Sequence, residues 1–211
     1  MHTKQSSMHP TKQSPLRLIL LAAALLPSLA GPPVLAASTQ VLRVPTADVL
    51  PFGKVALEAA LPAVGSLEKV EVGLPAGFQA SLAIPGTGLD QGATLDVKYR
   101  PVEGTLLTPA IAAGATYNTA KKSVSPYAAV TKGILGAKVT LGAHLDELAN
   151  GAAEPVFGAL DLGLFGPLHV LAERDHGTTR LGASVSLLNT EVKAYVEGDR
   201  TMLVGRVTLP F

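Results

Sequence analysis

The sequence predicts an all-β fold, a membrane-embedded antiparallel up-and-down β-barrel of about 12 strands that follows an N-terminal signal peptide. Three observations lead to this prediction. After Ser38 apolar and polar residues alternate with a period of two, and helical periodicity is missing almost everywhere. Short runs rich in Gly, Pro, Asn and Asp separate the alternating segments. The first 36 residues have the composition of an export signal.

The N-terminal segment has the parts of a secretory signal peptide. Its leader carries three basic residues, Lys4, Lys12 and Arg17. The apolar run LILLAAALLPSLA follows and is shorter than a transmembrane helix needs. Val34 and Ala36 then occupy positions −3 and −1 of a cleavage site, and cleavage one residue later is the alternative. We expect residues 1–36 to be a signal peptide, rather than an uncleaved anchor, and residues 37–211 to form a single β-barrel domain.

Alternation marks the candidate strands directly. Each spans roughly eight to eleven residues, the length that a tilted strand needs to cross a bilayer. Short turns between consecutive strands indicate an antiparallel meander. The expected strands are 54–61, 67–74, 77–84, 93–101, 106–116, 126–133, 136–146, 156–164, 167–174, 178–187, 190–197 and 201–211.

Composition excludes several classes of function. The formal net charge is +1, and no basic cluster exists beyond Lys121-Lys122, so we expect no nucleic-acid partner. The chain has no cysteine, which excludes a disulfide framework and thiolate chemistry. No GxSxG, HExxH, P-loop or dinucleotide fingerprint has structural support in the sequence. We therefore expect no catalytic residues and no cofactor.

Alternation defines an apolar and a polar face without saying which one points inward. A soluble barrel or sandwich has its apolar face inside, whereas a membrane barrel turns it toward lipid and must close, because an open edge in lipid is costly. We expect the membrane form because the protein carries an export signal and charges rarely interrupt the apolar face. A soluble exported β-sandwich that binds a ligand is the alternative, favoured by the small number of aromatic residues.

The last residues of the sequence also favour the membrane form. The sequence closes with LVGRVTLPF, and Leu209 and Phe211 share one face of the last strand. This pattern resembles the C-terminal signal that the barrel-assembly machinery of bacteria recognises. We therefore expect an outer-membrane protein whose partners are the outer-membrane lipid and that machinery.

With the polar face inward, charged residues of both signs would line the lumen. Opposite charges at cross-strand spacing can pair, and a barrel of about 12 strands is narrow enough to be filled largely by side chains. We interpret these residues as a structural plug of ion pairs; the alternative is the lining of a narrow passive channel for small solutes. The expected network is Lys54, Glu58, Lys69, Glu71, Asp96, Lys98, Arg100, Lys138, Asp146, Glu173, Arg180, Glu191, Lys193, Glu197 and Arg206.

Histidines are the remaining candidates for chemistry. His144 with Asp146, and His169 with Glu173, share strand faces at spacings that suit a metal site or a hydrolase triad. We expect instead that the histidines join the hydrogen-bonded network of the lumen, with no metal site and no enzymatic activity.

Just after the expected signal peptide, from Thr39, the sequence reads TQVLRVPTADVLPFGKVALE. The order Pro-Thr-Ala at 45–47, Leu-Pro at 50–51 and Gly53 resembles the opening of the YjbH-like family, whose repeats often begin PTA…LP.G. The closing stretch from Leu168 to Phe211 is similar in layout to the final strands of such barrels. The resemblance implies an outer-membrane barrel with an envelope or exopolysaccharide-associated role, although this chain is far shorter than the multidomain members.

A local reading of the same stretch stays open. PTADVLPFG is also a proline-rich entry to the first strand, in which Pro45 and Pro51 cap an unpaired edge and Gly53 turns the chain.

Overall fold

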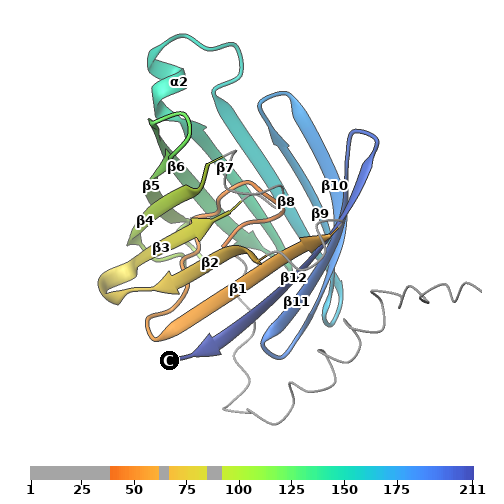
Figure 1. Cartoon of the computed structure of the whole chain (residues 1–211). Helices are drawn as coiled ribbons and strands as arrows, with labels where there is room; N and C mark the ends of the chain where they lie inside the picture. The colour runs from red at the N-terminus through yellow and green to blue at the C-terminus, as the bar shows by residue number, and fades with distance from the viewer. Residues whose placement is uncertain (1–38, 62–66, 85–91) are drawn as a thin grey trace, which may run out of the picture. The chain divides into compact units, whose positions relative to one another are not determined.

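A computed structural model of the chain shows a closed barrel of antiparallel strands (Figure 1). The structure describes residues 39–61, 67–84 and 92–211; the expected signal peptide lies outside them. Each strand pairs with the next along the chain, and the first pairs with the last. The strands are β1 (Lys54–Leu61), β2 (Leu67–Gly73), β3 (Phe78–Ala83), β4 (Thr94–Val102), β5 (Ala110–Asn118), β6 (Ser123–Ile134), β7 (Ala137–His144), β8 (Val156–Phe165), β9 (Leu168–Asp175), β10 (Thr178–Leu187), β11 (Thr190–Glu197) and β12 (Arg200–Pro210).

The predicted antiparallel barrel is confirmed. Most strand ends differ from the expected ones by one to three residues, and the start of β5 differs by four; two of these differences have a clear local cause. β5 begins at Ala110 instead of 106, because Thr105 and Thr108 close a turn through a backbone hydrogen bond of 2.9 Å. β7 ends at His144, because the short helix α2 (Leu145–Ala149) follows it. The prediction that Asp146 lies on this strand is therefore wrong; it lies in the first turn of α2, where acidic residues are favoured.

The apolar face of the barrel wall points outward. Leu141, Leu181 and Val97 lie in the middle of three different strands and are 64%, 60% and 52% exposed. The inner face carries buried charged residues such as Lys98 and Arg206. Within the described strands this is the inverse of a soluble barrel or sandwich, in which the apolar face is inside.

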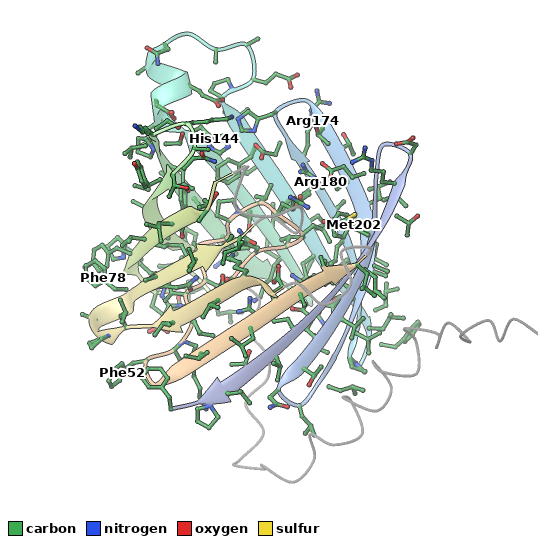
Figure 2. The ribbon with its side chains drawn as sticks, in the orientation of Figure 1. Phe52, Phe78, His144, Arg174, Arg180 and Met202 are labelled. Carbon is green, nitrogen blue, oxygen red and sulfur yellow. The ribbon has the colours of Figure 1, made fainter. Side chains whose placement is uncertain are left out.

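Side chains extend from both faces of the barrel wall (Figure 2). On the inner face, aromatic residues lie over glycines of the adjacent strand. The cross-strand pairs are Tyr127 with Gly114, Phe157 with Gly142, and Tyr195 with Gly182. A Cβ atom at Gly142 would overlap the ring of Phe157, so glycine provides the space that the ring fills. The three rings belong to the buried apolar cluster of the barrel.

The two ends of the barrel have different connections. Turns that follow even-numbered strands share one end with Phe211; the turns 135–136, 166–167 and 188–189 have two residues, and the longest connection at this end is 103–109. This end is termed the short-turn end. The opposite, long-loop end has two-residue turns at 176–177 and 198–199 and the longest connection of the described strands, residues 145–155 with α2, at the top of Figure 1. Among the described residues, no helix has the length and hydropathy needed to cross a membrane.

Candidate functional site in the barrel lumen

Residues 39–50, termed the lumen segment, precede β1 and lie inside the barrel. Val44 is fully buried and Leu50 is nearly so. Ala47 packs against Ala110 and Ala112 of β5. The segment therefore contacts the inner wall with apolar side chains along its length.

The lumen segment folds back on itself in a tight turn. The Thr46 N–H donates to the Thr39 carbonyl at 3.1 Å, and Gln40 pairs with Pro45. Pro45 therefore does not cap a strand edge, and β1 has no unpaired edge because it is bonded on both sides. That part of the local reading of PTADVLPFG is wrong.

Glu173 on β9 holds the turn of the lumen segment. Its carboxylate accepts the N–H groups of Leu42, Arg43 and Val44 at 2.9 to 3.0 Å. Arg180 on β10 donates to the same carboxylate at 3.1 Å. Because the Glu173 side chain is fully buried, one guanidinium and three amides replace water around its charge.

Two inward-facing lysines bind carbonyl oxygens of the lumen segment. The Lys98 Nζ atom lies 3.2 Å from the carbonyl oxygens of both Thr39 and Thr46. The Lys193 Nζ atom lies 2.7 Å from the carbonyl oxygen of Val41. Both ammonium groups therefore hold main-chain atoms of the segment in addition to facing carboxylates of the wall.

Neutral side chains satisfy further backbone groups of the segment. Gln79 accepts the N–H of Leu50 at 2.7 Å, and Thr131 accepts the N–H of Ala47 at 2.8 Å. A buried N–H group without such a partner would cost on the order of 1–3 kcal/mol. The polar side chains of the inner wall are therefore placed as hydrogen-bond partners for backbone groups of the lumen segment.

Ion pairs within the wall accompany these contacts. Glu71 accepts from Lys69 at 2.7 Å and also pairs with Arg206, which lies 3.6 Å from Glu58. Thr39 of the lumen segment donates to Glu71 at 2.7 Å. The largest cluster of wall charges thus includes the lumen segment as well.

Most residues of the predicted lumen network lie on the inner face of the strands. They are Lys54, Glu58, Lys69, Glu71, Asp96, Lys98, Arg100, Lys138, Glu173, Arg180, Glu191, Lys193, Glu197 and Arg206. Asp146 on α2 is the exception. The interpretation that ion pairs between strands make the plug is incomplete, because residues 39–50 occupy the lumen and bind many of these side chains.

A cavity of about 310 Å³ remains between the lumen segment and the long-loop end. Its wall includes Lys69, Lys98 and Asp96, and Asp96 accepts a hydrogen bond from Thr116 at 3.1 Å. Arg43 of the lumen segment also lines it. The cavity wall therefore carries charges of both signs.

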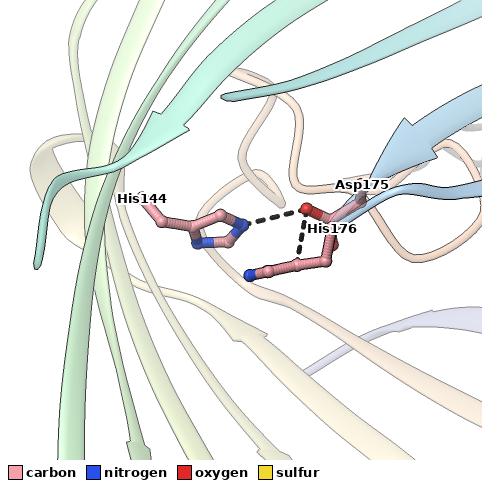
Figure 3. Close-up of side chains that lie close together, drawn as sticks. All are labelled: His144, Asp175 and His176. Carbon is pink, nitrogen blue, oxygen red and sulfur yellow. Dashed lines mark hydrogen bonds and ion pairs between the residues drawn. The ribbon is translucent and has the colours of Figure 1, made fainter. Parts of the chain in front are cut away.

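His144, Asp175 and His176 lie together at the long-loop end (Figure 3). The Oδ1 atom of Asp175 is 3.0 Å from Nε2 of His144 and 2.9 Å from Nδ1 of His176. Nε2 of His176 lies 2.7 Å from Oε1 of Glu147 on α2. This hydrogen bond, with a smaller contribution from Asp175, raises the pKa of His176 above its ordinary value.

The histidine partners inferred from sequence spacing are wrong. His144 meets Asp175 instead of Asp146, and Nδ1 of His169 lies 2.7 Å from Oδ1 of Asp161 instead of binding Glu173. Spacing along one strand identified neighbours on a face, but the actual partners lie across the sheet. The up-and-down order of the strands could have predicted that His144 and Asp175 are close, because it brings the end of β7 and the β9–β10 turn to the same end of the barrel.

No protein-family model matches this sequence, and no curated protein is found to be similar to it. The resemblance to the YjbH-like family stays a prediction. The structure shows a closed antiparallel β-barrel that encloses part of its own chain.

Proposed function

We propose that this protein is an outer-membrane β-barrel with a structural role in the cell envelope, closed by its own lumen segment. The outer face of the wall is the observation that carries the proposal. Large apolar side chains are exposed on it around the barrel, including Val97, Leu141, Val170 and Leu181. Lipid would cover this surface, whereas water would leave an apolar area far larger than soluble monomers expose.

The aromatic residues support a position in a bilayer. Exposed aromatic side chains gather near the short-turn end: Phe52, Phe78, Tyr99, Phe165 and Phe211. The rings of Phe78 and Tyr99 stack with centroids 4.4 Å apart. Membrane barrels place such a girdle at the lipid–water interface. Five exposed aromatic side chains thus lie at the short-turn end of the outer face, and Tyr117 lies near the long-loop end.

The connections support one orientation. Bacterial barrels have short turns on the periplasmic side and longer loops outside. In this orientation the short-turn end with Phe211 faces the periplasm, and the 310 Å³ cavity opens toward the long-loop, extracellular side. Leu209 and Phe211, which we expect the assembly machinery to recognise, lie at this periplasmic end of the barrel, because β12 ends there.

The occupied lumen favours a structural role over passive solute conduction. Glu173, Lys98 and Lys193 bind the lumen segment from three different strands. A channel would require this segment to leave and would break all of these contacts. The association with exopolysaccharide stays a prediction from the resemblance.

Membrane fractionation of the expressed chain tests the proposal. The membrane fraction is run on a denaturing gel with and without boiling. We expect a detergent-extractable outer-membrane band whose mobility changes on boiling, as closed barrels resist the detergent until heated. A soluble periplasmic or secreted protein without a mobility change would overturn the proposal.

A further inference from the structure

We propose that His144, Asp175 and His176 form a binding site for a divalent transition-metal ion of the zinc class at the long-loop end of the barrel (Figure 3). The site goes beyond the envelope role and departs from the sequence-based expectation of no metal site. Two imidazoles and one carboxylate are a donor set that suits Zn²⁺.

The geometry of the three side chains is close to that of a metal site. One donor atom from each residue lies within 4.8 Å of the others. Ligand atoms about 2.1 Å from a tetrahedral zinc ion lie roughly 3.4 Å from one another. The separations of 3.0 and 2.9 Å from Asp175 to the two histidines therefore need only small side-chain adjustments.

Neighbouring groups orient both imidazoles. Glu147 lies 2.7 Å from Nε2 of His176, so it can accept the proton on that nitrogen and leave Nδ1 free as a ligand. A carboxylate in this position is the usual outer partner of a metal-binding histidine. The ring of His144 packs against Phe157, with centroids 5.1 Å apart.

The position of the site suggests an accessible metal. His144 and Asp175 line the 310 Å³ cavity, so a fourth coordination position would face this space. Three protein ligands with an open position are typical of sites that bind water or a small anion at the metal. The site would also tie three segments together, because its ligands come from the end of β7 and from the β9–β10 hairpin, and Glu147 comes from α2.

Cobalt titration of the purified full chain tests this inference. The protein is treated with a chelator, dialysed and titrated with Co²⁺, a spectroscopic substitute for Zn²⁺. We expect visible absorption bands that saturate at one ion per chain and disappear when Zn²⁺ is added. Each of the variants H144Q, D175N and H176Q should lose the bands, and E147Q should weaken binding about 10–100-fold.

His169→Gln is the matched control. His169 also pairs with a carboxylate, Asp161 at 2.7 Å, but no second histidine forms part of that pair. H169Q should bind Co²⁺ like the native chain. His176 is about half-exposed in a turn, so H176Q should keep the fold even if H144Q does not. Absence of the bands in the native chain, or their persistence in H176Q, would overturn the inference.

Discussion

At the scale of single residues, Glu173 accepts hydrogen bonds from three successive backbone N–H groups of the lumen segment. Glu173→Ala would remove the acceptor of three buried N–H groups and leave Arg180 without one of its two carboxylate partners. Breaking a buried ion pair from one side costs about 3–5 kcal/mol. We expect a decrease of this size in the free energy of unfolding, measured by urea denaturation in detergent.

Trypsin cleavage within the lumen segment is a second test of the role of Glu173. Arg43 at its turn is a trypsin site, and the intact barrel should shield its backbone because Glu173 holds it. Trypsin should cleave at Arg43 in the E173A variant and leave it intact in the native chain. Glu154→Ala is the control, since Glu154 forms an exposed pair with Arg174. Equal protection of Arg43 in E173A would contradict the role assigned to Glu173.

His176 predicts a pH dependence of the long-loop end in the metal-free protein. Its pKa is raised in the folded state by the hydrogen bond to Glu147, and Asp175 adds to this effect; the ring of His144 also faces it. A raised folded pKa means that the stabilisation is fully present below the unfolded value near 6.5 and is lost as the pH rises through the folded value.

Hydrogen exchange of residues 145–155 measures this dependence. All exchange rates are first corrected for the intrinsic pH dependence of amide exchange. After this correction we expect stronger protection at pH 5.5 than at pH 8.5 in the native chain, on either side of the ordinary histidine pKa of about 6.5. The H176Q variant should show no such difference in protection. An equal difference in H176Q would assign the titration to another group.

At the scale of elements, the sequence predicts the wall much better than it predicts the lumen. Strands β1, β10 and β11 begin and end as expected, because a period of two in apolar residues reports directly which side of a sheet each residue occupies. The lumen segment has no such period. Its partners are Gln79, Thr131 and other side chains far away in the sequence, so local pattern carries no information about its position.

The candidate site shows the same limit. The charged inner face could be predicted because each strand alternates, whereas the pairs across it depend on register. His144 meets Asp175, two strands further along the sheet, although Asp146 is closer in sequence. Helix α2 removes Asp146 from the strand, and the strand pattern of 136–146 does not signal that change.

An engineered disulfide tests the position of the lumen segment. The native chain has no cysteine, so Ala47→Cys with Thr131→Cys introduces a single pair. The Ala47 N–H group lies 2.8 Å from the Thr131 hydroxyl oxygen, so the lumen segment contacts the inner face of β6 at this point. We expect oxidation to join them in the folded barrel, seen as a loss of free thiols that reduction reverses.

The control pair is Ala47→Cys with Val97→Cys. Val97 points to the outside of the barrel and is 52% exposed, so its thiol should stay free in the folded protein. Free thiols in the Ala47–Thr131 pair under oxidising conditions would place the lumen segment elsewhere.

At the scale of the whole molecule, the surrounding medium decides the cost of a charge on the outer face. Leu141→Arg places a guanidinium in the middle of β7, where the leucine is 64% exposed. In a bilayer such a change costs about 2–4 kcal/mol near the midplane, whereas a solvent-exposed position tolerates it. We expect L141R to lower stability by this amount in lipid vesicles, measured by urea denaturation.

Leu188→Arg is the matched control. Leu188 lies in a turn at the short-turn end and is 61% exposed, so its arginine would reach water or head groups. L188R should change the stability by less than about 1 kcal/mol. Equal effects of the two substitutions would argue against a lipid-covered outer face.

Single-channel recording in planar bilayers tests the central claim most directly, namely that the lumen segment closes a membrane barrel. The native chain is compared with a variant that lacks residues 39–50, and the change in gel mobility on boiling verifies that both barrels are folded. We expect no resolvable conductance from the native chain and discrete openings from the deletion variant, because the lumen segment fills the native lumen. Steady conductance of equal size from both folded proteins would contradict the account.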